Sequence, residues 1–516
     1  MRRVLFVLFV LTLTLIVSGC SLMFYGDVNG NWKIREDRAD DHSALLASME
    51  AAQMLRIPDL IDVTEDGARY ELTVNESDFA FFEGFTTKVK SYSDQGYLGP
   101  TIKMRRGSTF YPTITNNLSE RTTVHWHGLE VTGENDGAMG SIALVYPGES
   151  KTYELAVDQH ASTIWYHPHA MGTTATQVYE GLAGMMIIED EIIENIDLPT
   201  DYGVNDIPLV LQAKLFDGQG NLHYGHTGGH GGDIEHAMNA APSVPGGEMD
   251  MEKQKMTYLL FEDRAGPNRI TTEGFLIMTN GQYAPYLEVK NELIRFRTLN
   301  GSNHGIMDVS LSDGSPLQVI GTDGGLLEAP QEKDFFEVVA GQRFEVIVDL
   351  SDKQIGDQVD LIANGQVVLT LRVTEDAPVK GEVPEDLVTI TAFEPYDNQQ
   401  VTHKYILDND MINNKPFSHT VPNEVFVKDQ IYYFEVVNRS FENHSFHIHN
   451  SQFLVVEKNG RKVDYKEIGW KDTIYLRPEE SMILQVQFRF TGDYMYHCHI
   501  LMHEENGMMG MFRVVD

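Results

Sequence analysis

Apolar and polar residues alternate in short runs over most of the chain after residue 55, which is the pattern of half-buried β-strands. Such runs occupy residues 69–74, 150–157, 209–213, 293–299 and 344–350. Gly, Asn, Asp and Pro separate the runs and mark turns. Many short strands divided by turn residues predict an all-β protein composed of Greek-key β-sandwiches.

Parts of this pattern repeat along the chain. Tyr-His-Pro-His at 166–169 is similar to Tyr-His-Cys-His at 496–499, and His-x-His at 125–127 is similar to His-x-His at 447–449. A related lead-in, Ala-Gly-Gln-Arg at 340–343, lies between these copies and has no histidine beside it. The repeat predicts a middle domain that acts as a spacer or docking element. We therefore predict three domains, at residues 55–192, 200–378 and 386–516.

The N-terminus has the pattern of a targeting segment. Two arginines precede an apolar run at 4–17, which is short for a membrane span and typical of a signal sequence. The run ends in Val-Ser-Gly-Cys, which is typical of a bacterial lipoprotein cleavage site, so Cys20 is predicted to carry a lipid. An ordinary signal peptide with an incidental cysteine is the alternative. We predict a signal peptide at 1–20, an acidic tether at 21–54, and an extracytoplasmic protein anchored to a bacterial membrane.

Composition narrows the range of partners. The 516 residues carry a formal net charge of −37, which disfavours nucleic acid and anionic surfaces as partners. The charge would concentrate cationic substrates, or it serves only solubility outside the cell. The two cysteines are predicted to serve a lipid and a metal, so no disulfide is expected. We expect a monomer.

The segment 497–508 reads His-Cys-His-Ile-Leu-Met-His-Glu-Glu-Asn-Gly-Met. Neighbours on a strand point to opposite faces, so Cys498 faces away from His497 and His499. A thiolate with His503 and the weak sulfur ligand Met508 suits a blue-type copper centre. The two imidazoles on the opposite face are available to a different metal site.

Three further segments are dense in histidine. One His-x-His pair can arise by chance, but four such segments around one cysteine indicate metal binding. With His444 assigned to the blue-type centre beside Cys498, eight histidines remain, and eight ligands suit three coppers that take three, three and two. These eight are His125, His127, His167, His169, His447, His449, His497 and His499.

These four segments resemble the signature of the multicopper oxidases, which include laccases and bacterial copper-efflux oxidases. Gly-Leu-Ala-Gly at 181–184 and Gly-Trp-Lys-Asp-Thr at 469–473 are similar to the copper-efflux branch, and the resemblance covers about residues 55–516. It implies three cupredoxin-like domains and four coppers. The type 1 copper would be held by His444, Cys498, His503 and axial Met508, the type 2 copper by His125 and His447, and the type 3 pair by the other six histidines.

The resemblance also implies an oxidase that couples one-electron oxidation of a substrate to reduction of O₂ to water. Electrons would leave the substrate near His444 or His503 and pass through Cys498 to the three-copper cluster. Glu504 and Asp136 match family positions for proton relays. The alternatives are that Asp136 only forms a turn, and that Glu504 is a surface acid or a partner of a ligand histidine.

The substrate is less closely defined. Oxidation of Cu(I) in copper tolerance is the first hypothesis, with other metal ions as alternative donors. A laccase acting on phenols or other organic compounds is the second hypothesis, and a non-catalytic binding protein is the third. The complete ligand set argues against the third. Glu442, just before His444, could receive a cation or could be a solvated loop acid. A His- and Met-rich loop at 223–256 could collect copper or have no ligand role.

Overall fold

The computed structural model describes residues 24–26, 32–34, 48, 53–93, 96–138, 140–217, 219–222, 275–408, 410–415, 417–418 and 420–516. Cys20, the His- and Met-rich loop at 223–256 and most of the tether at 21–54 lie outside these residues. Within the described part of the tether, strand β1 (Phe24–Gly26) pairs with β2 (Trp32–Ile34). None of the helices among the described residues has the length and apolarity needed to cross a membrane.

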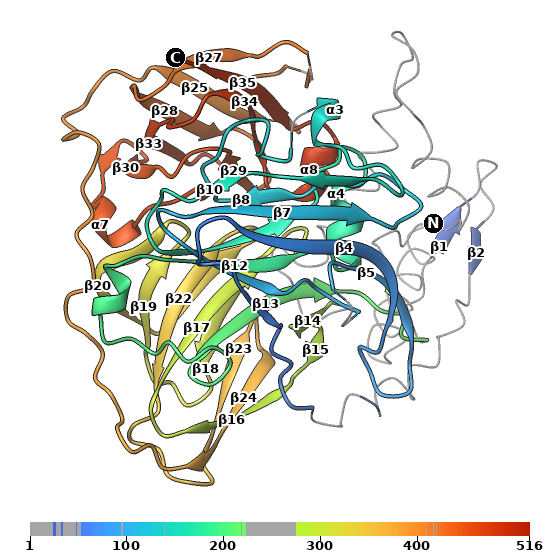
Figure 1. Ribbon diagram of the computed structural model, residues 1–516, viewed down its shortest axis with the longest axis vertical. Helices are drawn as coiled ribbons and strands as arrows, with labels where there is room; N and C mark the ends of the chain where they lie inside the picture. Colours follow the sequence, from blue (N-terminus) through green and yellow to red (C-terminus); the bar gives the residue numbers. More distant parts are fainter. Residues whose placement is uncertain are drawn as a thin grey trace, which may run out of the picture.

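The remaining described strands form three pairs of sheets, which we call the first, middle and last units (Figure 1). In the first unit one sheet has the order β10-β7-β4-β5, with β9 beside β7, and the other has the order β3-β6-β12-β11-β8. The elements are β3 (Leu60–Asp62), β4 (Ala68–Phe79), β5 (Thr87–Ser91), β6 (Thr101–Arg105), β7 (Thr109–Asn116), β8 (His125–His127), α3 (Gly140–Ala143), β9 (Ser150–Thr152), β10 (Leu155–Ala156), β11 (Ser162–His167), α4 (Thr174–Glu180), β12 (Gly184–Glu189) and the short helix η1 (Ile193–Asn195).

The middle unit has a larger sheet, β15-β14-β13-β17-β22-β19-β20, and a smaller one, β16-β24-β23-β18-β21. Its strands are β13 (Asp206–Lys214), β14 (Leu276–Thr279), β15 (Gln282–Tyr283), β16 (Tyr286–Lys290), β17 (Leu293–Asn300), β18 (Ile306–Leu311), β19 (Leu317–Thr322), β20 (Gly325–Lys333), β21 (Phe335–Val339), β22 (Arg343–Asp349), β23 (Gln358–Ala363) and β24 (Gln366–Glu375).

The last unit consists of the sheets β26-β25-β28-β33-β30-β31 and β27-β35-β34-β29-β32. Its elements are β25 (His403–Asp408), β26 (Met411–Ile412), β27 (Glu424–Val427), β28 (Ile431–Asn438), β29 (His444–Ile448), β30 (Leu454–Lys458), β31 (Arg461–Lys462), α7 (Tyr465–Ile468), β32 (Thr473–Leu476), β33 (Ser481–Gln487), β34 (Gly492–Cys498), α8 (Leu501–Glu505) and β35 (Met509–Val515).

The three units share one topology. A parallel pair recurs in one sheet of each unit, as β4 with β7, β13 with β17 and β25 with β28. A second parallel pair recurs in the other sheet, as β6 with β12, β16 with β24 and β27 with β35. Strands that are not consecutive in sequence must cross between sheets to form such pairs. The prediction of an all-β protein made of cupredoxin-like sandwiches is confirmed.

Each unit encloses its own apolar core. The first core includes Leu72 and Ile114, the middle one Leu209 and Val348, and the last one Phe446 and many neighbours from both sheets. Alternation along the strands sends these side chains inward and leaves polar ones on the surface. Figure 1 shows the last unit, in orange and red, lying against the first unit, in blue and cyan, with the middle unit on the other side.

Candidate metal centre

The strand β34 carries the central residues of the site. It pairs with β29 so that His497 lies opposite His447 and Cys498 lies opposite Phe446. Because side chains alternate along a strand, Cys498 points into the apolar core of the last unit and belongs to the same buried cluster as Phe446. His497 points the other way, toward histidines of the first unit.

On the core side, two histidines converge on the thiol. Cys498 Sγ lies 3.6 Å from His444 Nδ1 and 3.6 Å from His503 Nδ1, and these two nitrogens are 3.1 Å apart. The helix α8 returns the chain so that His503 reaches this point, and the Met508 N–H donates to the His503 carbonyl at 2.9 Å. All four side chains are buried. Met508 lies in the same buried core cluster as Cys498. The thiol and two imidazoles that converge here are donors that were predicted for a blue-type copper.

Burial raises the pKa of the Cys498 thiol to about 12. Without a metal the thiol therefore stays protonated at neutral pH, since desolvation disfavours the thiolate. A bound cation would replace the proton, because metal ions bind the deprotonated sulfur. The site is thus chemically suited to a soft metal ion and poorly suited to act as a free nucleophile.

On the opposite side of β34, the eight other predicted histidines form one buried cluster between the first and last units. His497 Nε2 lies 3.2 Å from His169 Nε2 and 3.1 Å from His449 Nε2. Three sets of ring nitrogens lie within 4.8 Å of one another: His125, His127 and His447; His127, His167 and His499; and His169, His449 and His497. In the first unit β8 and β11 carry His125, His127 and His167, and His169 follows the end of β11. In the last unit β29 and β34 carry His447 and His497, and His449 and His499 directly follow these two strands.

The ring nitrogens point inward as metal ligands should. His125 Nε2, His127 Nδ1, His167 Nε2 and His447 Nε2 are buried with no hydrogen-bond partner among the described residues. The other nitrogen of three of these rings donates to a backbone carbonyl, which fixes the ring and leaves a lone pair directed at the cluster. Burial lowers the pKa of His125 to about 3, so the imidazole stays neutral and able to bind a cation. The donor set therefore fits metal ions.

Two predicted carboxyl groups touch histidines from both units. Asp136 Oδ2 lies 2.9 Å from His449 Nδ1, and the Asp136 carbonyl accepts from His125. Glu504 lies 3.4 Å from both His169 Nδ1 and His497 Nδ1. Glu504 is only 1% exposed, so it is not a surface acid.

Burial also shifts the proton affinity of these two acids. It raises the pKa of Asp136 to about 6 and that of Glu504 well above the usual range of a carboxyl. Both groups therefore sit where a proton can be held beside the histidine cluster.

A third buried carboxylate, Asp472, was not singled out by the sequence. Its Oδ1 lies 3.1 Å from His127 Nε2, and its backbone carbonyl accepts from His447 Nδ1 at 2.8 Å. Burial raises the pKa of Asp472, but Arg343 and His127 together outweigh this effect and hold the pKa well below its usual range. The conspicuous Gly-Trp-Lys-Asp-Thr motif was the only signal in the sequence that could have indicated this residue.

At the outer edge of the thiol site, two carboxylates flank His503. Glu442 Oε2 lies 3.8 Å and Asp410 Oδ1 lies 4.0 Å from His503 Nε2. Glu442 was predicted here, whereas Asp410 was not, because it lies on a distant turn that only folding brings to His503. Phe441, beside Glu442, is 98% exposed. The edge of this site therefore offers both acidic and aromatic contacts.

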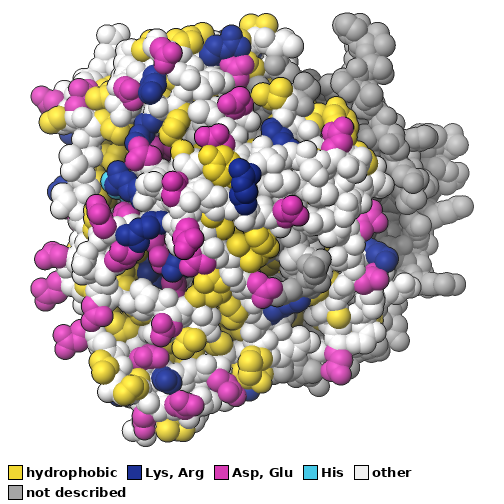
Figure 2. Space-filling model, viewed as in Figure 1, with side chains coloured by type: hydrophobic (Ala, Val, Ile, Leu, Met, Phe, Trp, Pro, Cys, Tyr) yellow, Lys and Arg dark blue, Asp and Glu magenta, His cyan; other side chains and the backbone are white. Residues whose placement is uncertain are grey.

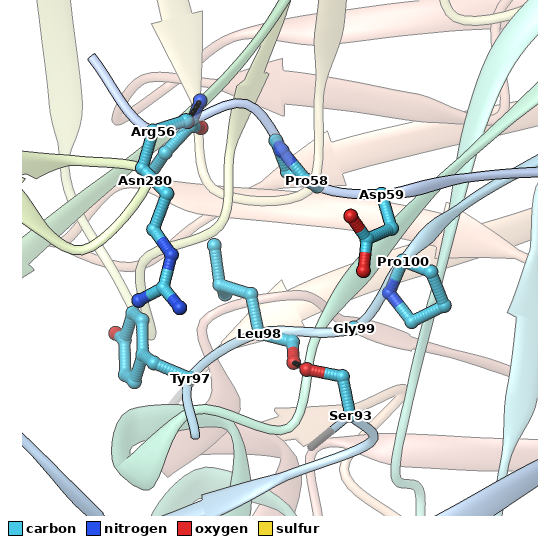
Figure 3. A pocket seen from close by; sticks show the side chains of 9 residues that line it. All are labelled: Arg56, Pro58, Asp59, Ser93, Tyr97, Leu98, Gly99, Pro100 and Asn280. Atoms are coloured by element: carbon cyan, nitrogen blue, oxygen red, sulfur yellow. Dashed lines mark hydrogen bonds between the residues drawn. The ribbon is translucent and has the colours of Figure 1, made fainter. Parts of the chain in front are cut away.

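Acidic and basic side chains are interspersed in Figure 2, and hardly any histidine surface is visible on the face that it shows. The pocket in Figure 3, between Arg56, Tyr97 and Asn280, has a volume of about 10 Å³ and no histidine lining it. It is too small for a substrate and does not reach the cluster.

The sequence is similar to known proteins of one family. Models of the multicopper oxidase family match residues 73–192 and 385–516. The multicopper oxidase mco of Staphylococcus aureus is 31% identical over 479 residues, which cover 91% of this chain and 94% of that protein. The chain belongs to the multicopper oxidase family. It is therefore an oxidoreductase of a copper-binding family, and the resemblance inferred from the four histidine segments is confirmed.

Two other similarities bear on its role. The crystal structure of a laccase from Pediococcus acidilactici Pa5930 superimposes with a TM-score of 0.76 at 30% identity, covering 90% of this chain and 94% of that one. The cell division protein FtsP of Escherichia coli (strain K12) is 28% identical and covers 84% of this chain and 86% of that one. Proteins named for different roles thus share this fold, so the role of this chain must be argued from its site.

Proposed function

We propose that this multicopper oxidase takes single electrons from a reducing substrate at the Cys498 site and uses four of them, with four protons, to reduce O₂ to two waters. The observation that carries the proposal is the position of Cys498 between His497, on the same strand, and His499, which directly follows that strand. This strand joins a sulfur site and a histidine cluster through a few covalent bonds. The site of substrate oxidation and the site of O₂ reduction are therefore joined by one rigid strand.

The residues would hold four coppers in two places. His444, Cys498, His503 and axial Met508 would hold a type 1 copper. His125 and His447 would hold the type 2 copper, and the type 3 pair would be held by His127, His167 and His499 on one side and by His169, His449 and His497 on the other. Copper, when bound, supplies one-electron redox chemistry and a place for O₂. The protein holds the rings apart, keeps them neutral and closes the cluster from bulk water.

Asp136 and Glu504 supply the protons in this proposal. Asp136 contacts His125 of the first unit through its backbone carbonyl and His449 of the last unit through its carboxyl group. The Glu504 carboxyl group contacts His169 and His497, so both acids lie where the two units assemble the cluster. A carboxyl in this position can hold a proton on its oxygen and release it to a reacting group within hydrogen-bond reach. The fully buried positions support this role over those of a simple turn former or a solvated acid.

Cu(I) is the substrate that the outer edge of the thiol site favours. Glu442 and Asp410 present two carboxylates at His503, and the strongly negative chain would attract cations toward them. We therefore propose a role in copper tolerance for a protein that Cys20 anchors outside the cytoplasm. A laccase acting on phenols is the alternative, which the exposed Phe441 favours because an aromatic ring can stack on it.

One experiment separates these functions. Oxygen uptake is measured with copper-loaded protein and either Cu(I) or a phenol as the donor, side by side. We expect uptake with Cu(I) at four ions oxidised per O₂. Faster uptake with the phenol would favour the laccase. No uptake with either donor would leave a copper-binding protein without oxidase activity.

A further inference from the structure

The guanidinium of Arg343, in the middle unit, joins all three units of the molecule. It is fully buried at the start of β22, within the Ala-Gly-Gln-Arg lead-in that carries no histidine. Its Nε donates to the Thr163 carbonyl of the first unit at 2.9 Å. Its two Nη atoms donate to the Gly341 and Asp323 carbonyls of the middle unit and to both carboxylate oxygens of Asp472 in the last. All five N–H donors of the guanidinium are therefore used.

Asp472 links this guanidinium to the histidine cluster. Its Oδ1 accepts from Arg343 Nη1 at 2.9 Å and lies 3.1 Å from His127 Nε2. Two more groups hold the carboxylate in place, since the Thr473 hydroxyl donates to Oδ1 at 2.8 Å and Gln452 Nε2 donates to Oδ2 at 3.1 Å. A carboxylate accepts only, so His127 must carry its proton on Nε2.

This arrangement makes His127 the exception within the cluster. In six of the other seven rings it is Nδ1 that contacts a carbonyl or carboxylate, which leaves Nε2 for the metal; these are His125, His167, His169, His447, His449 and His497. In His127 the order is reversed, and the buried Nδ1 has no partner among the described residues.

The middle unit also touches a second ring of the same ligand group. A Cβ added to Gly341, which has φ +87°, would lie 2.9 Å from the His499 ring, so the backbone there packs directly against that imidazole. Neither ring nitrogen of His499 has a hydrogen-bond partner among the described residues, so packing alone orients it. Two of the three rings in the group of His127, His167 and His499 are thus held by a unit that supplies no ligand.

We propose that Arg343 is a positioning residue: by clamping Asp472 against His127 it selects the Nδ1 atom of His127 as the copper ligand. The middle unit is then part of the metal centre rather than a spacer. This inference rests on the proposed copper cluster, and it concerns only how the protein prepares the ligand.

The first test compares two buried arginines of the middle unit. Arg343→Lys keeps the charge but loses the planar fork that matches a carboxylate. Arg295→Lys is the matched control, because Arg295 is equally buried and pairs with Glu345, which contacts none of the predicted ligands. Both variants are loaded with copper, and copper per chain is followed against rising chelator, with the melting temperature recorded.

We expect Arg343→Lys to release cluster copper at a chelator concentration at least about 10-fold lower than the wild type. Loss of a partner behind a ligand histidine typically weakens metal binding about 10–100-fold. The blue colour of the Cys498 site should persist in both variants. Equal chelator sensitivity of Arg343→Lys and the wild type would overturn the inference, as would equal loss in Arg295→Lys, which would indicate general destabilisation.

The second test needs no arginine variant and no copper. In metal-free wild-type protein with ¹⁵N-labelled histidines, NMR distinguishes the two neutral tautomers, and a His127→Gln variant identifies the His127 signals. We expect the proton on Nε2 in His127. A proton on Nδ1 would overturn the inference even if Arg343→Lys fails to fold. Wild-type protein that binds no copper in the cluster would refute the proposed function, and with it the claim that Nδ1 of His127 binds copper. The tautomer result would then still decide whether Asp472 holds the proton on Nε2.

Discussion

The smaller sheets of the middle and last units have the same strand order but differ in what two equivalent strands carry. In the smaller sheet of each, a parallel pair at one edge is followed by two further strands, β23 and β18 in the middle unit and β34 and β29 in the last. β29 and β34 bear His444, His447, His497 and Cys498, whereas β18 and β23 bear no histidine. One sandwich can therefore be metal-binding or purely structural, depending on a few side chains at the strand ends.

What the middle unit contributes instead comes from its larger sheet. β22 begins at Arg343, and the turn before it holds Gly341 against the histidine cluster. The apolar pattern that forms the sandwich is independent of this contact, because the core of the middle unit consists of other residues. A unit that carries none of the predicted ligands can therefore still shape a metal site through the residues that face its neighbours.

The largest expected effect is that of removing the sulfur that distinguishes the last unit. Cys498→Ser should abolish both the blue colour and oxygen uptake, because a hydroxyl is a poor ligand for a site built around a thiolate. Absorption spectra and oxygen consumption measure this directly. Cys20→Ser is the control: it should release the protein from the membrane and keep the colour. A blue, active Cys498→Ser protein would contradict the assignment.

The second prediction concerns the seam between the first and last units. Glu504→Gln should lower the rate of oxygen reduction about 10²–10⁴-fold, the usual range for loss of a proton-transfer group. Substrate should still bleach the blue colour in the absence of oxygen, since this step does not need the carboxyl.

Glu505→Gln is the matched control for this seam. Glu505 accepts from the Ala175 N–H and contacts none of the predicted ligands. Its variant should leave the oxygen rate close to that of the wild type. If Glu504→Gln reduces oxygen as fast as its control, Glu504 is only a structural partner of His169 and His497.

The third prediction tests the opposite expectation for one part of the middle unit, where the buried group of Glu345, Arg295 and Arg297 should serve stability alone. Burial raises the pKa of Glu345, but Arg295 and Arg297 outweigh it and lower the pKa to about 2. The depressed pKa means that the ionised carboxylate stabilises the folded state above its unfolded pKa, and that this contribution is lost as the pH falls from about 4.5 toward 2. Glu345→Gln should therefore lower the free energy of unfolding at pH 7 by about 3 kcal/mol.

Denaturant unfolding at several pH values checks this prediction. The gap between wild type and Glu345→Gln should narrow as the pH falls through the window from about 4.5 to 2. As a control, Glu337→Gln removes an exposed partner of Arg477 and should cost less than about 1 kcal/mol. A gap that stays constant with pH would show that the pair does not act through the charge of Glu345.

The sequence predicted the parts of this molecule that depend on local pattern. Alternation predicted the sandwiches, and the spacing within His-Cys-His placed Cys498 and His497 on opposite faces of one strand, as the structure has them. The sequence contained no sign of Asp410, and it indicated no role for Asp472 or Arg343 although both lie in motifs that it offered. Their roles depend on contacts between units, and an isolated acid or arginine in a strand or turn has the same local pattern whether it lies on the surface or against a metal site.

The smallest expected effect concerns substrate binding at the outer edge of the thiol site in the last unit. Asp410→Asn and Glu442→Gln each remove one of the two carboxylates near His503, and each should raise the KM for Cu(I) about 10-fold, which corresponds to about 1.4 kcal/mol of binding. The kcat should change little, because the thiol site itself is intact.

The phenol serves as the control substrate. A phenol needs no anionic contact, so its KM should stay the same in both variants. Phe441→Ala should instead raise the KM for the phenol and leave the KM for Cu(I) unchanged. If Asp410→Asn changes neither value, the carboxylates near His503 are solvated bystanders, and the preference for a cationic donor must arise elsewhere on the acidic surface.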